Sequence, residues 1–119
     1  MATITATVTK VPDGGVTNVY IALWEAMGNA DTGTAVQMAG ASDRSVQVQG
    51  TFGAATVTIQ GSNDGTNYQT LTDPQGNALT WTTANRLEQI SELTRYVRAI
   101  TAGGTGTDIN VTMLLKGQF

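Results

Sequence analysis

SVQVQGTFGAATVTIQGSNDGTNYQTLTD, residues 45–73, is the stretch of this chain that decides its fold. Apolar and polar residues alternate through three segments, 45–52, 55–62 and 67–72, and glycine-containing links separate them. Alternation with period two predicts strands that each turn one face toward a core. We therefore predict three consecutive strands, with Val48 and Ile59 buried opposite each other in the first hairpin.

The same alternation extends the prediction toward both ends of the chain. Further strands are predicted for residues 3–9, 16–27, 35–38, 78–82, 95–101 and 108–115. Residues 83–92 fit either a strand or one helical turn. Turn signals recur about every ten residues, which favours antiparallel strands in two layers. The sequence therefore predicts one all-β domain over residues 1–119, a single antiparallel β-sandwich or jelly roll of about eight short strands. Residues 1–15 are expected to form an extended N-terminal arm or an edge strand.

Composition excludes several kinds of chemistry. Charged residues make up 13% of the chain, about half the usual share. The formal net charge is −3 and no run of Lys or Arg exists, which argues against nucleic acid as a partner. The chain contains neither Cys nor His, so disulfides, imidazole catalysis and the commonest zinc ligands are absent. We expect a protein without enzymatic activity, cofactor or bound metal.

The first residues carry neither a basic region nor an apolar core of the kind found in secretion signals. No stretch of the sequence is long and apolar enough to span a membrane. We therefore expect synthesis in a cytoplasm and no membrane partner.

Two motifs suggest ligand sites but are better interpreted as turns. Asn63-Asp64-Gly65 could begin a calcium loop, but the closing glutamate of such a loop is missing. Gly103-Gly104-Thr105-Gly106 could hold a phosphate, but no Lys-Ser/Thr and no helix follow it. The first motif is predicted to be a hairpin turn and the second a flexible loop.

The only local concentration of charge lies between residues 86 and 98. It comprises Arg86, Glu88, Glu92, Arg95 and Arg98. Neighbouring arginines would hold both carboxylates ionised, which argues against an acid–base pair of the glycosidase type. The simpler hypothesis is that these residues form a salt-bridged face of the domain. The more specific hypothesis is that they form a contact between subunits.

Residues 3–9 offer a second candidate contact. Ile4, Ala6 and Val8 are expected on the buried side of this strand. The opposite side presents Thr3, Thr5 and Thr7 to solvent or to a neighbouring subunit. We name these threonines and the charge cluster as the candidate partner contacts.

The aromatic residues allow two interpretations. They are Tyr20, Trp24, Tyr68, Trp81 and Tyr96, with Tyr20 and Trp24 on the opposite face of their segment from Val19, Ile21 and Leu23. Aromatic residues of a small β domain usually anchor its core or an interface. The alternative is a stacking platform for a sugar.

The order of the segments resembles that of a known family. Residues 42–52, 61–68, 71–79, 95–99 and 103–106 look like the strands and turns of head decoration, or cement, proteins of tailed bacteriophages. The resemblance covers nearly all of the chain from Ala39 onward, and the N-terminal third matches less specifically.

The resemblance implies a binding function. Such a protein would bind the outer surface of the expanded shell of the major capsid protein, as a homodimer or homotrimer, after synthesis in the host cytoplasm. The first and last strands would offer free edges for pairing with a capsid arm or a sister subunit. The alternative is a tail or fibre-associated module that binds a host glycan through Trp24 or Trp81.

Overall fold

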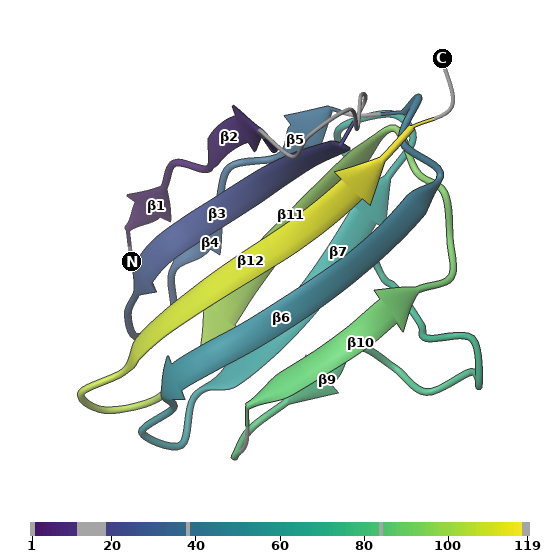
Figure 1. Ribbon diagram of the computed structural model, residues 1–119. Helices are drawn as coiled ribbons and strands as arrows, with labels where there is room; N and C mark the ends of the chain where they lie inside the picture. The colour runs from purple at the N-terminus through teal and green to yellow at the C-terminus, as the bar shows by residue number, and fades with distance from the viewer. Residues whose placement is uncertain (1, 12–18, 38, 84, 118–119) are drawn as a thin grey trace.

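The computed structural model describes residues 2–11, 19–37, 39–83 and 85–117, and these form strands and turns without a helix (Figure 1). The strands are β1 (Thr3–Ile4), β2 (Thr7–Lys10), β3 (Val19–Met27), β4 (Thr32–Gly33), β5 (Val36–Gln37), β6 (Asp43–Thr51), β7 (Thr56–Ser62), β8 (Gln69–Thr70), β9 (Thr80–Trp81), β10 (Arg86–Ile90), β11 (Tyr96–Ala102) and β12 (Asp108–Lys116). The predictions at residues 1, 12–18 and 38 lie outside the described residues.

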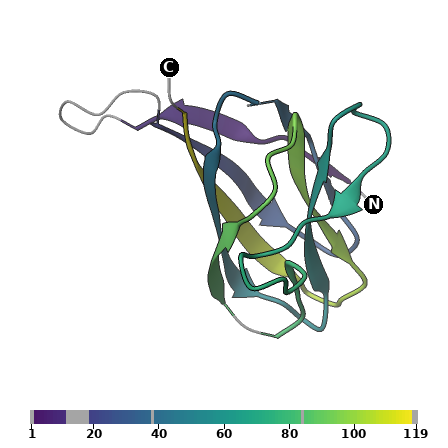
Figure 2. The same cartoon turned by 90° about the vertical axis from the view of Figure 1, so that its right-hand side faces the viewer.

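The strands build two sheets that pack face to face, as the side view in Figure 2 shows. The front sheet of Figure 1 has the order β10-β6-β12-β3-β2, with every pair antiparallel. The back sheet has the order β1-β4-β11-β7-β8, with β5 also paired to β11 and β9 to β7. The described residues include one parallel pair, β1 with β4.

The path of the chain is that of a jelly roll. From β3 onward the chain passes from front sheet to back sheet and returns, and only β4–β5 and β7–β9 follow one another within the back sheet. The resulting order β3-β12-β6-β10 faces β4/β5-β11-β7-β8/β9. Two four-stranded sheets interleaved in this way define the jelly roll. The all-β sandwich prediction is confirmed, in its jelly-roll form.

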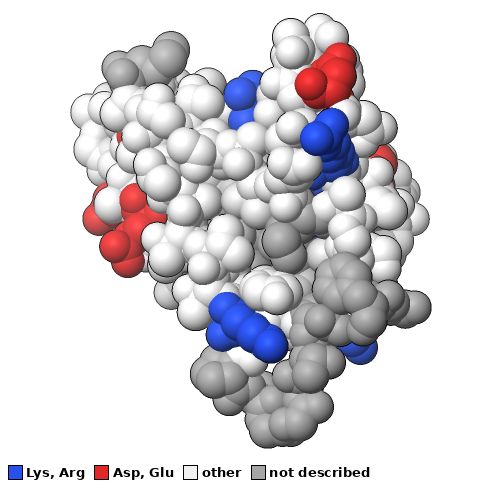
Figure 3. All heavy atoms as spheres, turned by 90° about the horizontal axis from the view of Figure 1, so that it is seen from above, with Lys and Arg blue, Asp and Glu red and all other residues white. Residues whose placement is uncertain are grey.

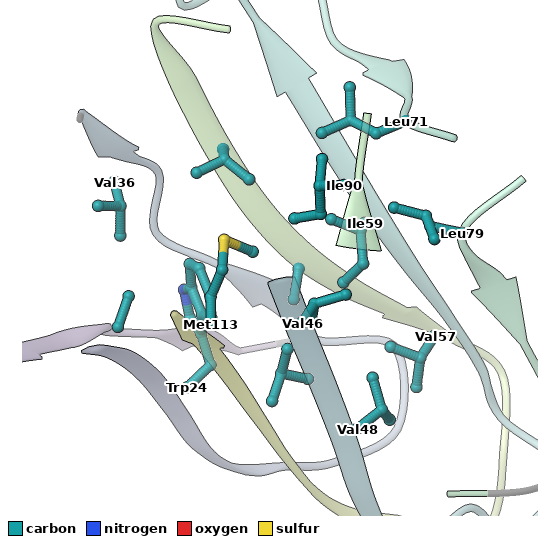
Figure 4. Packing of buried hydrophobic residues seen from close by; sticks show 14 of the residues in the cluster. Trp24, Val36, Val46, Val48, Val57, Ile59, Leu71, Leu79, Ile90 and Met113 are labelled. Carbon is teal, nitrogen blue, oxygen red and sulfur yellow. The ribbon is translucent and has the colours of Figure 1, made fainter. Parts of the chain in front are cut away.

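The predicted hairpin between residues 45–52 and 55–62 is wrong. β6 pairs with β10 and β12, whereas β7 pairs with β11, β8 and β9. A turn in which the Ala55 N–H donates to the Phe52 carbonyl, with positive φ at Gly53 and Ala54, carries the chain between the sheets. Val48 and Ile59 are both fully buried, but on facing sheets (Figure 4). Alternation fixes which face of a strand is buried and leaves its pairing partner open.

The core lies between the sheets and is mostly aliphatic (Figure 4). On β3 the inward face carries Ala22 and Trp24, while Ile21 and Leu23 point outward and are half-buried. The Trp24 indole N–H donates to the Thr34 carbonyl over 2.9 Å, which satisfies the polar atom of a fully buried ring. Trp24 is therefore part of the core, which agrees with the interpretation favoured for the aromatic residues and rules this residue out of the alternative, a sugar platform.

The predicted strand at residues 3–9 is divided between the sheets. β1 lies beside β4 at the edge of the back sheet, and β2 lies beside β3 at the edge of the front sheet. Ile4 and Ala6 pack against the core, as predicted. Val8 is 45% exposed instead of buried, because β2 is an edge strand whose inner side extends past the core. The segment thus covers one open side of the sandwich.

Arg44 is a buried cation at one end of the core. It lies on the inward side of β6 and is 3% exposed. Its Nε donates to the Ala41 carbonyl over 2.7 Å, and its Nη2 donates to the Thr94 carbonyl over 2.7 Å. Burial lowers the pKa of the guanidinium. The side chain therefore links the loops before β6 and before β11.

Replacing Arg44 by Lys is expected to lower the free energy of unfolding by about 1–3 kcal/mol. A lysine keeps the charge but lacks the planar fork that reaches two loop carbonyls at once. Chemical denaturation of both proteins checks this. The matched control is Arg86→Lys on exposed β10, expected within about 0.5 kcal/mol of the parent. Equal losses in the two variants would contradict the role given to Arg44.

Candidate functional site: two outer sheet faces

The outer face of the front sheet carries, between the Asp43–Lys116 pair at one end and the opposite end of the strands, an uncharged, partly apolar surface, which we call the front face. Strand register aligns its side chains in two rows: Ile21–Leu114–Ser45–Gln89 and Leu23–Thr112–Gln47–Leu87. The rows cross four strands and contain aliphatic, hydroxyl and amide groups. No member of either row is ionisable.

Two exposed leucines stand out on the front face. Leu87 is 69% exposed and Leu114 is 43% exposed. Two hollows of about 310 and 320 Å³ both border Leu114 and Ser45, and the smaller one is also lined by Asp43, Arg44, Gln89 and Lys116. The larger is lined by Ile21, Ser45, Gln47, Leu87, Thr112 and Leu114. A solvated face of an antiparallel sheet normally carries polar residues, so the hollows and the exposed leucines set this face apart from an ordinary solvated one.

Sequence reasoning missed the front face, although a signal for it was present. Leu114 stands between Met113 and Leu115, where alternation calls for a polar residue. Leu87 gave no such signal, because it alternates regularly with Arg86 and Glu88, and only the register of β10 shows that it faces outward. Apolar residues that break a period-two pattern on the solvent side are the sequence mark of such a face.

The predicted charge cluster is not one cluster in the structure. Arg86 and Glu88 lie on β10 of the front sheet, opposite inward-facing Val48 and Val46. Arg95 and Arg98 belong to the back sheet, just before and within β11. Among the described residues no ion pair joins any of the five. Figure 3 shows one end of the molecule, where the blue and red groups are few and scattered over a mostly uncharged surface.

Glu92 binds a threonine instead of an arginine. Its carboxylate accepts hydrogen bonds from the Thr72 N–H over 2.8 Å and from the Thr72 hydroxyl over 2.5 Å. Partial burial raises the pKa of the Glu92 carboxyl, but these hydrogen bonds outweigh it and hold the pKa below its usual value. Glu92 thus fixes the loop after β10 to the loop before β9.

The three candidate threonines are exposed but do not share one face. Thr7, opposite Leu23, borders the front face. Thr3 pairs with Thr32 in the back sheet, and Thr5 lies between β1 and β2. The free edges also differ from the expectation. The last strand, β12, lies in the middle of the front sheet, and β10 and β2 form its edges.

The outer face of the back sheet carries a different surface, which we call the arginine–tyrosine patch: Tyr68, Arg95, Tyr96 and Arg98. The guanidinium carbon of Arg98 lies 3.8 Å from the centre of the Tyr68 ring, and its Nε donates to the Gln60 side-chain oxygen over 3.0 Å. The guanidinium carbon of Arg95 lies 5.2 Å from the centre of the Tyr96 ring. Both distances are within the range of cation–π contacts.

The loop beside this patch is organised by Asp64. Its carboxylate accepts hydrogen bonds from the N–H groups of Asn67 and Thr66, from the Asn67 amide and from the Ser62 hydroxyl, each over 2.8 Å. These bonds, led by the one from the Asn67 N–H, hold the pKa of Asp64 far below its usual value. Gly65 follows with φ +79°, so the turn prediction for these residues is confirmed.

Replacing Asp64 by Ala is expected to lower the thermal midpoint at pH 7. The folded-state pKa lies below the unfolded value of about 3.9, so the carboxylate stabilises the fold above that pH. Its contribution declines as the pH falls toward the folded-state pKa. Thermal unfolding from pH 7 to pH 2 should show the gap between parent and variant narrowing below about pH 4. Asp108→Ala, at another exposed aspartate, is the control at pH 7, and a pH-independent gap for Asp64→Ala would contradict the account.

Other site chemistry is limited in the described part of the chain. No group of three Asp or Glu side chains there is placed to hold a metal ion. None of the described residues forms a helix long and apolar enough to cross a membrane. Trp81 is half-buried and packs against the core.

Comparison with known proteins gives similarity of fold. No protein-family model matches the chain, and no curated protein matches it. Among solved structures, the SPBc2 prophage-derived protein YomS is similar with a TM-score of 0.64 at 12% identity, over 87% of this chain and 98% of that one. The K1 cleaved adhesin domain of Lys-gingipain from Porphyromonas gingivalis W83 has a TM-score of 0.44 at 12% identity, over 98% of this chain and 85% of that one. A cupin domain from Bordetella pertussis Tohama I has a TM-score of 0.37 at 14% identity, over 100% of this chain and 99% of that one.

Proposed function

We propose that this protein is a head decoration protein of a tailed bacteriophage, which binds the outer surface of the major capsid protein lattice and stabilises the expanded head. The front face carries the proposal, because its two rows hold no ionisable group, two hollows border it and two leucines on it are exposed. The shared fold with a prophage-derived protein supports the phage assignment. Jelly rolls also occur in viral capsid proteins, lectins and cupins. The fold therefore does not identify the function, which has to be argued from the chemistry of the surface.

The size of the front face fits a stable interface. Strands β3, β6 and β12 each have nine residues, which gives a length of about 30 Å. The edge strands β10 and β2 are shorter, with five and four residues. At about 4.8 Å between strands, the five strands present about 570 Å², near the low end of the roughly 600–1,000 Å² that each partner buries in a standard interface.

The chemistry of the front face also fits docking on a shell. Covering its two rows removes water from hydroxyl, amide and aliphatic groups, and no ionised side chain in those rows has to be desolvated. Each Ser, Thr and Gln can both donate and accept hydrogen bonds, so the surface adapts to polar groups on its partner. Repetition over a lattice would strengthen a modest contact through multivalency.

The proposal includes the assembly and place of the protein. We expect a homodimer or homotrimer on the outer surface of the phage head, with the major capsid protein as its main partner. We expect no catalytic activity, cofactor, nucleic-acid partner or membrane partner. The edge strands β10 and β2 are available for pairing with a capsid arm or a sister subunit.

A tail or fibre-associated module that binds a host glycan remains the alternative, but its structural support is weak. Trp24 is buried in the core, and Trp81 is half-buried. The ring of Tyr68 is covered on one face by Arg98. Trp24 therefore offers no ring face to a sugar, and the rings of Trp81 and Tyr68 are each covered in part.

Co-sedimentation with expanded shells of the major capsid protein tests the proposal. We expect saturable binding with a fixed ratio of this protein to the capsid protein. Binding to purified host surface polysaccharide, with no binding to shells, would favour the glycan alternative instead.

A further inference from the structure

We infer that the arginine–tyrosine patch on the back sheet is a second binding site, and that it takes a carboxylate-bearing segment of a protein partner. The inference rests on the proposed function, since it assigns a partner chemistry to the face opposite the one that docks on the shell.

The Arg98 guanidinium is fixed before any partner arrives. Tyr68 lies against one face of it, and Gln60 accepts from its Nε. The two terminal amino groups of Arg98 have no acceptor among the described residues. Two terminal amino groups without an acceptor on one planar guanidinium can bind a carboxylate with two parallel hydrogen bonds. Because the side chain is already ordered, binding sacrifices little rotamer entropy.

Arg95 adds a second cation to the same surface. Its Nε and Nη2 lie 3.0 and 3.1 Å from the Gln37 amide oxygen, with that amide turned to accept. Gln37 stands opposite Tyr96 in the register of β5 and β11. No carboxylate neutralises either arginine within the described residues, although the chain as a whole has a net charge of −3. An uncompensated positive patch on an acidic protein favours an acidic partner.

The nearest acidic side chain does not supply that partner. Asp64 lies in the loop next to the patch, but both of its carboxylate oxygens accept hydrogen bonds within the loop. The loop also packs on the aromatic side of the patch, because a Cβ at Gly65 would meet the Tyr96 ring at 3.0 Å. The loop therefore forms one wall of the site and leaves the charge of the arginines unpaired.

The same contacts favour an acidic peptide over a sugar or a nucleic acid. Sugars bind through open aromatic faces, and here Arg98 covers Tyr68 while Arg95 and the loop crowd Tyr96. Nucleic acids need a longer track of cations than two arginines. What remains is a short row of carboxylates, such as an Asp- or Glu-rich segment of a shell protein. With the two sheet faces on opposite sides of the sandwich (Figure 2), one copy could contact two shell components at once.

Titration calorimetry with a hexaglutamate peptide tests the inference, with hexaglutamine as the uncharged counterpart. We expect the full-length protein to bind hexaglutamate and not hexaglutamine, with affinity falling as salt rises. Arg98→Gln should weaken binding at least tenfold, and Arg98→Lys should weaken it less because the charge remains. The matched control Arg86→Gln, on the front sheet, should change affinity less than twofold. Thermal midpoints of all variants show that each one is folded.

Several outcomes would overturn the inference. They are no binding of hexaglutamate by the parent protein, equal affinity in Arg98→Gln and parent, or equal binding of hexaglutamine. Tighter, Arg98-dependent binding of oligogalacturonate would assign the patch to acidic glycans instead. Co-sedimentation with shells distinguishes a failure of this inference from a failure of the proposed function. If the parent binds shells and Arg98→Gln binds them equally, the patch has no part in shell binding, while failure of the parent to bind shells refutes the function itself.

Discussion

A Val48→Asp protein fails to fold. Val48 lies in the middle of β6, is fully buried and packs among Val46 and Val57 in the core (Figure 4). A carboxylate there has no charge partner, and burying it costs several kcal/mol whether it stays ionised or takes up a proton. That cost is comparable with the whole stability of a domain of this size, about 5–15 kcal/mol. The variant should accumulate as insoluble protein, or show no cooperative transition by circular dichroism.

The neighbouring position provides a matched control. Gln49 is the next residue of the same strand and is exposed on the opposite face. Gln49→Asp should fold with a free energy of unfolding within about 0.5 kcal/mol of the parent. A soluble, monodisperse Val48→Asp protein with the parental midpoint would show that β6 faces the other way.

The second large effect concerns the front face. We expect the double variant Leu87→Glu, Leu114→Glu to lose shell binding while keeping its fold. Both leucines are exposed, so their replacement leaves the core intact. In the complex, however, each glutamate would bring an unpaired charge into an apolar contact, which costs about 1–3 kcal/mol or more per site. Together these changes, about 2 kcal/mol or more, predict at least a roughly thirtyfold loss of affinity in co-sedimentation.

Leu93→Glu is the control for this experiment. Leu93 is 52% exposed but lies in the loop between β10 and β11, outside the two rows of the front face. It should bind shells like the parent. If Leu93→Glu and the double variant lose binding equally, then general surface charge, and not the front face, governs the interaction.

The prediction from sequence succeeded where a single strand carries the information. Alternation in residues 108–115 placed Ile109, Val111, Met113 and Leu115 on one face, and all four are fully buried in β12. The turn at Asp64 was also predicted, because Asn, Asp and Gly bond and bend locally.

The failures concern long-range pairing and edges. The Gly53-Ala54 link looks like a hairpin turn in the sequence, yet it carries the chain between sheets. Both arrangements bury the same faces, so only the distant partners β10, β11 and β12 decide between them. Val8 is exposed for a related reason. An inward-facing apolar residue on an edge strand is buried only if the facing sheet reaches as far as that strand.

The candidate site was predicted in part. Arg95 and Arg98 were named as contacts, and the structure places both in the arginine–tyrosine patch with Tyr68 and Tyr96. Grouping them with Arg86 and Glu88 assumed that neighbours in sequence share a face. In a jelly roll β10 and β11 belong to different sheets, so that assumption fails.

The copy number of this protein per virion tests the central claim most directly. Quantitative mass spectrometry of purified particles would measure it against the major capsid protein. A head decoration protein that covers the lattice should be present at a ratio close to that of the capsid protein itself. A value of only a few copies per particle would contradict the account and place the protein in the tail.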